Sequence, residues 1–248
     1  MHINMYNYSW LALLGLLLSQ GVLSVEKKIT NSDKPPAISV AVSVPSSVNS
    51  STIPQLHKVK RAWFDTEPAS PAARHVADWV VNSGDNRRRP FVIIDKADAK
   101  VYVFNAFGNL QRATPALLGL AKRDDDEPGV GSLKLSGIRP ELRTTPAGRY
   151  VARMGHNLKG QEILWVDYTA GISMHRVVTS NKLERRQERL DTPTILDNRI
   201  SFGCINVPIP FFEQVVMPTF AGKSGIVYIL PETRSASEVF GSYAVDAQ

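Results

Sequence analysis

The stretch Arg199-Ile200-Ser201-Phe202-Gly203-Cys204-Ile205-Asn206-Val207-Pro208 contains the only cysteine in this 248-residue chain. A glycine precedes Cys204, and the Ile-x-Val pattern after it predicts a short strand that ends at Pro208. We therefore expect the thiol at a junction between a turn and a strand, beside backbone N–H groups. A cysteine nucleophile for acyl transfer needs that geometry, whereas the alternative is a buried structural cysteine.

Composition is that of a globular protein, with 43% hydrophobic and 21% charged residues. The net charge of +6 favours a polyanionic neighbour, such as a cell-wall polymer or an acidic membrane surface, and we expect no nucleic-acid partner. The acidic run at 124–127 lacks the spacing of an EF-hand, and Lys134 interrupts a dinucleotide-binding glycine pattern. We therefore expect neither a metal nor a cofactor.

Residues 1–24 are predicted to be a signal peptide, because the apolar run that starts at Trp10 is too short for a membrane span. This predicts an exported protein of the periplasm or cell envelope with no stable membrane span. No Lys or Arg precedes Trp10, so an uncleaved anchor is the alternative. A single cysteine in an oxidising compartment cannot form an intrachain disulfide, which leaves an inert buried thiol or a reactive free one.

The rest of the chain divides by composition. Residues 25–69 are rich in Ser, Val, Pro and Thr and are predicted to be a flexible linker. A folded domain is predicted over residues 70–233, beginning with a helix that Ser70 caps and Pro71 starts. Residues 234–248 are predicted to be a loose tail.

Strand patterns dominate the predicted domain, so its fold class is mainly β with a few short peripheral helices. The predicted strands cover residues 90–95, 100–105, 110–115, 161–168, 171–178 and 225–230, and a further strand follows the Thr-Pro-x-Gly turn at 145–148. Short helices are predicted at 182–190 and 211–217. The connection at 121–140 is predicted to be a solvated loop.

Three pieces occur in a specific order: Thr145-Pro146-x-Gly148, a mid-strand His175, and Ser201-x-Gly203-Cys204-Ile205-x-Val207. This ordered set resembles the L,D-transpeptidase (YkuD-like) catalytic domain over roughly residues 89–231. The resemblance implies a β-sandwich or barrel. Two features depart from the family pattern. Phe202 occupies the place of a usual second histidine, and the stretch 176–200 is longer than usual.

The resemblance also implies roles for individual residues. Cys204 matches the nucleophile, His175 matches its partner, and Gly203 matches a glycine whose backbone helps to form the oxyanion hole. The candidates for substrate binding are Ser201, Asn206 and Arg199. On chemical grounds, an imidazole beside a thiol makes a thiolate available, and we expect a backbone carbonyl to orient the other ring nitrogen of His175.

By this resemblance the substrate is a peptidoglycan stem tetrapeptide, which forms a thioester at its third residue and releases the terminal D-alanine. The acyl group then passes to an amine or to water. Two alternatives stay open: a non-catalytic peptidoglycan-binding module, which the Phe202 departure favours, and a Cys–His hydrolase or amidase of cell-wall peptides. Residues 179–198 lie between the two catalytic candidates and are predicted to overhang the site.

Overall fold

The computed structural model describes residues 59–245. The predicted signal peptide and residues 25–58 of the predicted linker lie outside the described residues. The last part of that predicted linker is not loose, because Phe64 is 3% exposed and its ring packs edge-on against Phe104 at 5.1 Å. The folded region therefore begins before residue 70.

An eight-stranded sheet forms the centre of the described region, in the order β3-β2-β1-β10-β5-β6-β7-β9. Its strands are β1 (Phe91–Asp95), β2 (Lys100–Phe104), β3 (Leu110–Pro115), β5 (Gly148–His156), β6 (Glu162–Asp167), β7 (Ile172–Arg176), β9 (Ile205–Val207) and β10 (Gly225–Ile229). A second sheet pairs β4 (Leu118–Gly119) with β8 (Arg199–Ser201). The predicted fold class, mainly β with short helices, is confirmed.

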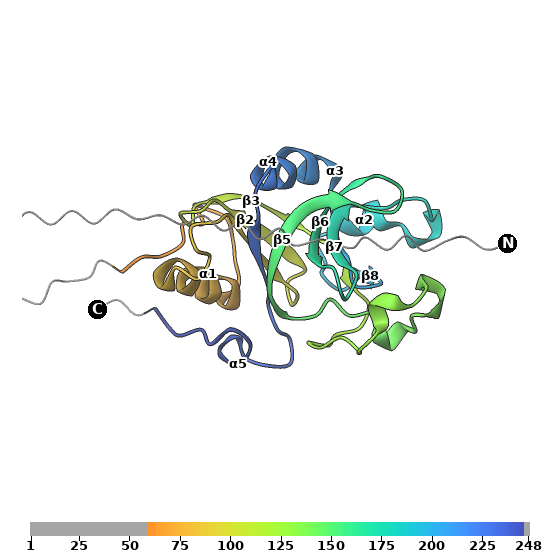
Figure 1. The fold of residues 1–248 in the computed structure, drawn as a ribbon, viewed down its shortest axis with the longest axis horizontal. Helices are drawn as coiled ribbons and strands as arrows, with labels where there is room; N and C mark the ends of the chain where they lie inside the picture. Colours follow the sequence, from red (N-terminus) through yellow and green to blue (C-terminus); the bar gives the residue numbers. More distant parts are fainter. Residues whose placement is uncertain (1–58, 246–248) are drawn as a thin grey trace, which may run out of the picture. The chain divides into compact units, whose positions relative to one another are not determined.

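Short helices surround the sheet (Figure 1). They are α1 (Pro71–Ser83), α2 (Arg186–Asp191), α3 (Ile209–Phe211), α4 (Met217–Phe220) and α5 (Ala236–Phe240), with 3-10 turns η1 (Val130–Ser132), η2 (Leu135–Gly137), η3 (Pro140–Leu142) and η4 (Lys182–Glu184). A π-helical segment, η5 (Phe212–Val216), joins α3 to α4, so the helix predicted at 211–217 does not end before Pro218 but continues to Phe220. Among residues 59–245, no helix is both long and apolar enough to cross a membrane.

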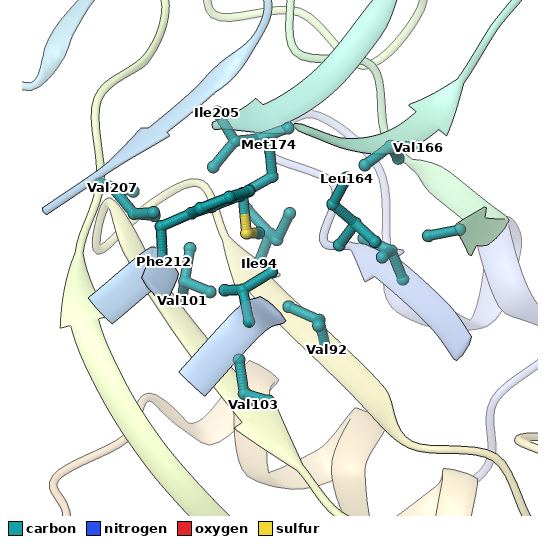
Figure 2. Packing of buried hydrophobic residues seen from close by; sticks show 14 of the residues in the cluster. Val92, Ile94, Val101, Val103, Leu164, Val166, Met174, Ile205, Val207 and Phe212 are labelled. Carbon is teal, nitrogen blue, oxygen red and sulfur yellow. The ribbon is translucent and has the colours of Figure 1, made fainter. Parts of the chain in front are cut away.

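Alternating side chains of the central strands fill two cores. Val92 and Ile94 of β1 face a cluster that includes Phe212 of η5, whereas Phe91 and Ile93 face a cluster that includes α1. Figure 2 shows the first cluster, in which residues of β1 and β2 meet residues of β6, β7 and β9. Because helices cover both faces, every residue of β1 is buried.

The C-terminal segment also differs from the predicted loose tail. Ser235 and Glu238 form a capping box that starts α5, and the Phe240 ring stacks on Trp79 at 6.3 Å. Trp79 is buried in the α1 cluster and the half-buried Phe240 packs against that cluster, which gives the segment an apolar anchor. The ordered region therefore extends past residue 234.

Candidate active site

Parallel pairing of β7 with β9 brings the two halves of the candidate site together. The register matches Met174 with Ile205 and His175 with Asn206. Cys204 precedes this pairing and lies beside Ser173, whose hydroxyl approaches the sulfur at 3.6 Å. The sulfur is also 3.5 Å from the Gly171 carbonyl oxygen. The thiol thus lies at the end of β9 nearest the start of β7.

A backbone carbonyl orients the imidazole of His175, as expected. Nδ1 lies 2.7 Å from the carbonyl oxygen of Arg176. Since a carbonyl only accepts hydrogen bonds, Nδ1 carries the proton, and Nε2 of the neutral ring is left as the base. This is the tautomer that can take the proton of the thiol.

The two groups shift each other's proton affinity. Burial opposes the charged imidazolium, but the hydrogen bond and the charge of Cys204 outweigh it and raise the pKa of His175. Burial likewise opposes the thiolate, but His175, assisted by the Ser173 hydroxyl, lowers the pKa of Cys204 below its ordinary value. Both shifts favour a thiolate–imidazolium pair.

Ser201 and Asn206 lie in the interior and hold the turn of the nucleophile. The Ser201 hydroxyl donates to the Cys204 carbonyl at 2.7 Å, and the Asn206 side-chain amide donates to the same oxygen at 3.1 Å. Their exposed fractions are 2% and 0%. They bond to the backbone of the nucleophile instead of facing a ligand, which differs from the predicted substrate contact.

The Thr-Pro-x-Gly turn has a role that its sequence did not indicate. The Thr145 hydroxyl donates to the Gly203 carbonyl at 2.7 Å and accepts from the Gly119 amide at 2.8 Å. Gly203 has φ 132°, and a Cβ there would lie 2.5 Å from the Thr144 carbonyl oxygen. Only glycine fits this position.

The amide of Gly203 is engaged, because it donates to the Ser201 hydroxyl at 3.1 Å. The amides of Phe202 and Cys204, by contrast, donate to no other described residue. These two N–H groups are therefore the candidates for an oxyanion hole, and the predicted contribution of Gly203 is limited to the backbone shape it permits.

Residues 122–143, which we call the covering segment, form one wall of a pocket at the thiol. The segment is drawn in green beside β8 in Figure 1. The pocket has a volume of about 90 Å³ and includes Cys204 and Phe202 in its lining. The wall formed by the covering segment is mostly apolar and includes Val130, Leu135 and Ile138, whereas residues 170–172 line the pocket from the start of β7. No pattern in the sequence indicated that this connection reaches the thiol.

Phe202 lies beside the nucleophile as a packing residue. The guanidinium of Arg143 is 4.0 Å from the centroid of its ring, which is a cation–π contact. The Arg143 side chain also donates to the Ile138 carbonyl at 3.1 Å, within the covering segment. Phe202 thereby links the turn of the nucleophile to the covering segment.

Arg199 is not part of the pocket. Its guanidinium pairs with Glu232 and donates to the Lys96 carbonyl, inside a buried cluster where Lys96 Nζ lies 2.9 Å from Asp124 Oδ1. Asp124 belongs to the acidic run that was predicted to be solvated, yet it is 3% exposed. Arg199 therefore ties β8 to the C-terminal segment, which differs from the predicted substrate contact.

Residues 179–198, which we call the insertion, contact the site from the side of His175. The Arg186 guanidinium donates to the Asn206 side-chain oxygen at 2.9 Å. Leu190 is 4% exposed and belongs to a cluster with Leu117 and Val177, which anchors α2. Within the described part of the chain, no group of three or more His, Cys, Asp or Glu side chains is arranged to hold a metal ion.

No family model and no curated protein matches the chain. Similar solved structures include the helical cell shape determining protein Pgp2 from Campylobacter jejuni, at 17% identity over 59% of this chain and 49% of that chain, with a TM-score of 0.38. An L,D-transpeptidase from Mycobacterium smegmatis is 14% identical over 57% of this chain and 58% of that chain, with a TM-score of 0.34. The catalytic domain of the Enterococcus faecium L,D-transpeptidase is 17% identical over 58% of this chain and 98% of that chain, with a TM-score of 0.31. The chain spans about half the length of the first two, and at these identities the similarity concerns the fold alone.

Proposed function

We propose that this chain is a cysteine acyltransferase that acts on peptidoglycan stem peptides. The observation that carries the proposal is the pairing of Cys204 with His175, whose Nδ1 is held by the Arg176 carbonyl. A thiol with a lowered pKa, an oriented base and unengaged backbone amides are the parts that acyl transfer needs. The peptidoglycan substrate comes from the motif resemblance, and the net charge of +6 suits an anionic wall polymer.

In the first half-reaction, the Cys204 thiolate attacks the carbonyl carbon of the third residue of a stem tetrapeptide. The amides of Phe202 and Cys204, which donate to no other described residue, are the proposed donors to the resulting oxyanion. The His175 imidazolium gives its proton to the leaving nitrogen when the C–N bond breaks. The products are a Cys204 thioester and free D-alanine, and His175 is left neutral.

In the second half-reaction, an amine attacks the thioester carbonyl. Neutral His175 accepts the proton that this amine loses, and the C–S bond breaks to regenerate the thiolate. The product is a new amide bond, either between two stems or between a stem and a protein. Water in place of the amine gives hydrolysis, so the same pair also supports a hydrolase or amidase.

The character of the pocket at the thiol supports the proposed attack on the donor peptide. Its walls are mostly apolar, which strengthens the electrostatic interactions of the thiolate and the oxyanion. For the location, we propose that residues 1–24 direct export to the periplasm or cell envelope, where the stem peptides are found. No cofactor takes part in the proposed chemistry.

The test is product analysis by mass spectrometry after incubation with a defined stem tetrapeptide, with and without an added amine. Transfer predicts free D-alanine in both cases and an amine-capped tripeptide only when the amine is present. Tripeptide alone in both cases would indicate a hydrolase. A protein that binds the peptide but leaves it intact, as Cys204→Ala should, would indicate the non-catalytic module.

A further inference from the structure

Arg186 reaches the candidate site from outside the motifs that carry the family resemblance. It is the first residue of α2 in the insertion, and its side chain is 10% exposed. Its Nη1 lies 2.9 Å from the Asn206 side-chain oxygen, and its Nε lies 2.6 Å from a carboxylate oxygen of Glu184. A nearly buried arginine with two engaged donor groups has a fixed position.

Asn206 connects this guanidinium to the nucleophile. Its side-chain oxygen accepts from Arg186, while its side-chain nitrogen donates to the Cys204 carbonyl at 3.1 Å. Asn206 is fully buried, so these two contacts determine which way its amide group points. Loss of the Arg186 contact would remove one of them and free the amide to rotate.

His175 lies on the same face of the sheet. The parallel register pairs it with Asn206, and paired residues of neighbouring strands point to the same side. Arg186, bonded to the Asn206 side chain, therefore lies on the side of the sheet to which the imidazole points, and its positive charge lowers the proton affinity of the ring. We propose that Arg186 is a positioning residue for the Cys204–His175 pair, acting on Cys204 through Asn206 and on His175 through its charge.

The insertion is built to hold this arginine. Arg189 donates to the carbonyl oxygens of Glu184 and Asp197, both at 2.7 Å, which ties the two ends of the segment together. The buried side chain of Leu190 fixes α2 against the domain. The insertion thus acts as a support for the nucleophile, in addition to any contact with substrate.

The other charges around His175 are accounted for. Arg176, next to it on β7, is paired with Glu162 and Glu213, and Cys204 is the proposed partner of the ring. Glu184 is paired with Arg186. Removal of Arg186 takes away a positive charge and leaves Glu184 unpaired, and both changes favour the imidazolium.

The first experiment is an NMR titration of His175 in the full chain, which needs no substrate. Arg186→Met should raise the pKa of His175, because a positive charge that lowers it is removed. Arg186→Lys keeps the charge and should restore the wild-type value. The matched control is Arg185→Met, since Arg185 is exposed and pairs with Glu188 instead. Equal titration curves for Arg186→Met and Arg185→Met would overturn the effect of charge.

The second experiment is a double-mutant cycle between Arg186 and Asn206, read as the rate of covalent modification of Cys204 by a carbapenem β-lactam. Arg186→Met and Asn206→Ala should each slow modification by about fivefold or more, and the double variant should be little slower than either. Additive losses would overturn the route through Asn206. This experiment rests on the proposed function: a wild-type protein that is never modified contradicts that function, and the titration of His175 still decides the role of Arg186.

Discussion

The hydroxyl of Thr145 donates to the carbonyl of Gly203 at 2.7 Å and so joins the Thr-Pro-x-Gly turn to the residue before the nucleophile. The hydroxyl oxygen of Thr145 also accepts from the Gly119 amide at 2.8 Å. Thr145 is fully buried, so these bonds are shielded from solvent. One side chain therefore fixes the spacing between β4, the turn and Cys204.

Thr145→Val should leave the Gly119 amide and the Gly203 carbonyl without their partner. An unsatisfied buried polar group costs about 1–3 kcal/mol, so we expect a loss of this order in the free energy of unfolding, measured with urea. Modification of Cys204 should also slow. Thr145→Ser keeps the hydroxyl and should retain most of the free energy of unfolding and most of the rate of Cys204 modification. Equal losses in the two variants would mean that the methyl group matters and the hydrogen bonds do not.

The pH dependence of Cys204 alkylation by iodoacetamide tests the ion pair. Because the pKa of the thiol is lowered, the thiolate should persist below the ordinary thiol pKa of about 8.5 and be lost only as pH falls through the folded-state value. His175→Ala should move this loss to higher pH. Ser173→Ala should move it in the same direction by less, since His175 has the larger effect. An unchanged profile in His175→Ala would contradict the pairing.

Two glycines of the covering segment give a matched pair of variants. A Cβ at Gly131 would lie 2.4 Å from the Thr169 carbonyl oxygen, whereas a Cβ at Gly137 would meet nothing within 4 Å. Gly131→Ala should push the covering segment off the turn before β7 and raise the substrate KM several-fold. Gly137→Ala should leave the kinetics unchanged. Equal KM values in the two variants would show that the segment does not shape the donor pocket.

The buried ion cluster predicts a large effect on stability. Lys96→Met removes the buried cation that contacts Asp124 Oδ1 and leaves only the half-exposed Arg234, 3.8 Å from Oδ2. Breaking such a buried pair costs about 3–5 kcal/mol in the free energy of unfolding, measured with urea. Burial alone would raise the pKa of Asp124, but hydrogen bonds from Thr233, the Glu232 amide and Lys96 lower it well below its usual range.

The depressed pKa of Asp124 sets the direction of a pH effect. This carboxylate stabilises the fold above the ordinary carboxyl pKa of about 3.9, and its contribution is lost as pH falls below that value. The free energy of unfolding, measured with urea, should fall less between pH 7 and pH 3 in Asp124→Asn than in the wild type. The same loss in both proteins would contradict a depressed pKa.

The local parts of the site were predictable from the sequence. A glycine, a cysteine and a short apolar strand that ends at Pro208 indicated the turn before β9, and the strand that contains His175 was also indicated. Short apolar runs between turn residues indicated most of the remaining strands. These features depend on neighbours in the chain, and sequence patterns report such neighbours well.

The parts that were missed depend on partners far away in the chain. Arg199 lies just before the motif of the nucleophile, yet its partners are Lys96 and Glu232, which no local pattern connects to it. The reach of the covering segment to the thiol is another such contact. The capping box that starts at Ser235 is different, because its Ser-x-x-Glu signature is local and would have indicated α5.

The central claim is that Cys204 is a nucleophile that holds an acyl group as a thioester, and intact-protein mass spectrometry with a carbapenem tests it most directly. A strained β-lactam acylates an activated thiol, and the chain has a single cysteine to receive it. The account predicts one covalent adduct that maps to Cys204, little adduct in Cys204→Ser, and slower formation in His175→Ala. Folded wild-type protein that stays at its unmodified mass and also leaves stem tetrapeptides intact would contradict it.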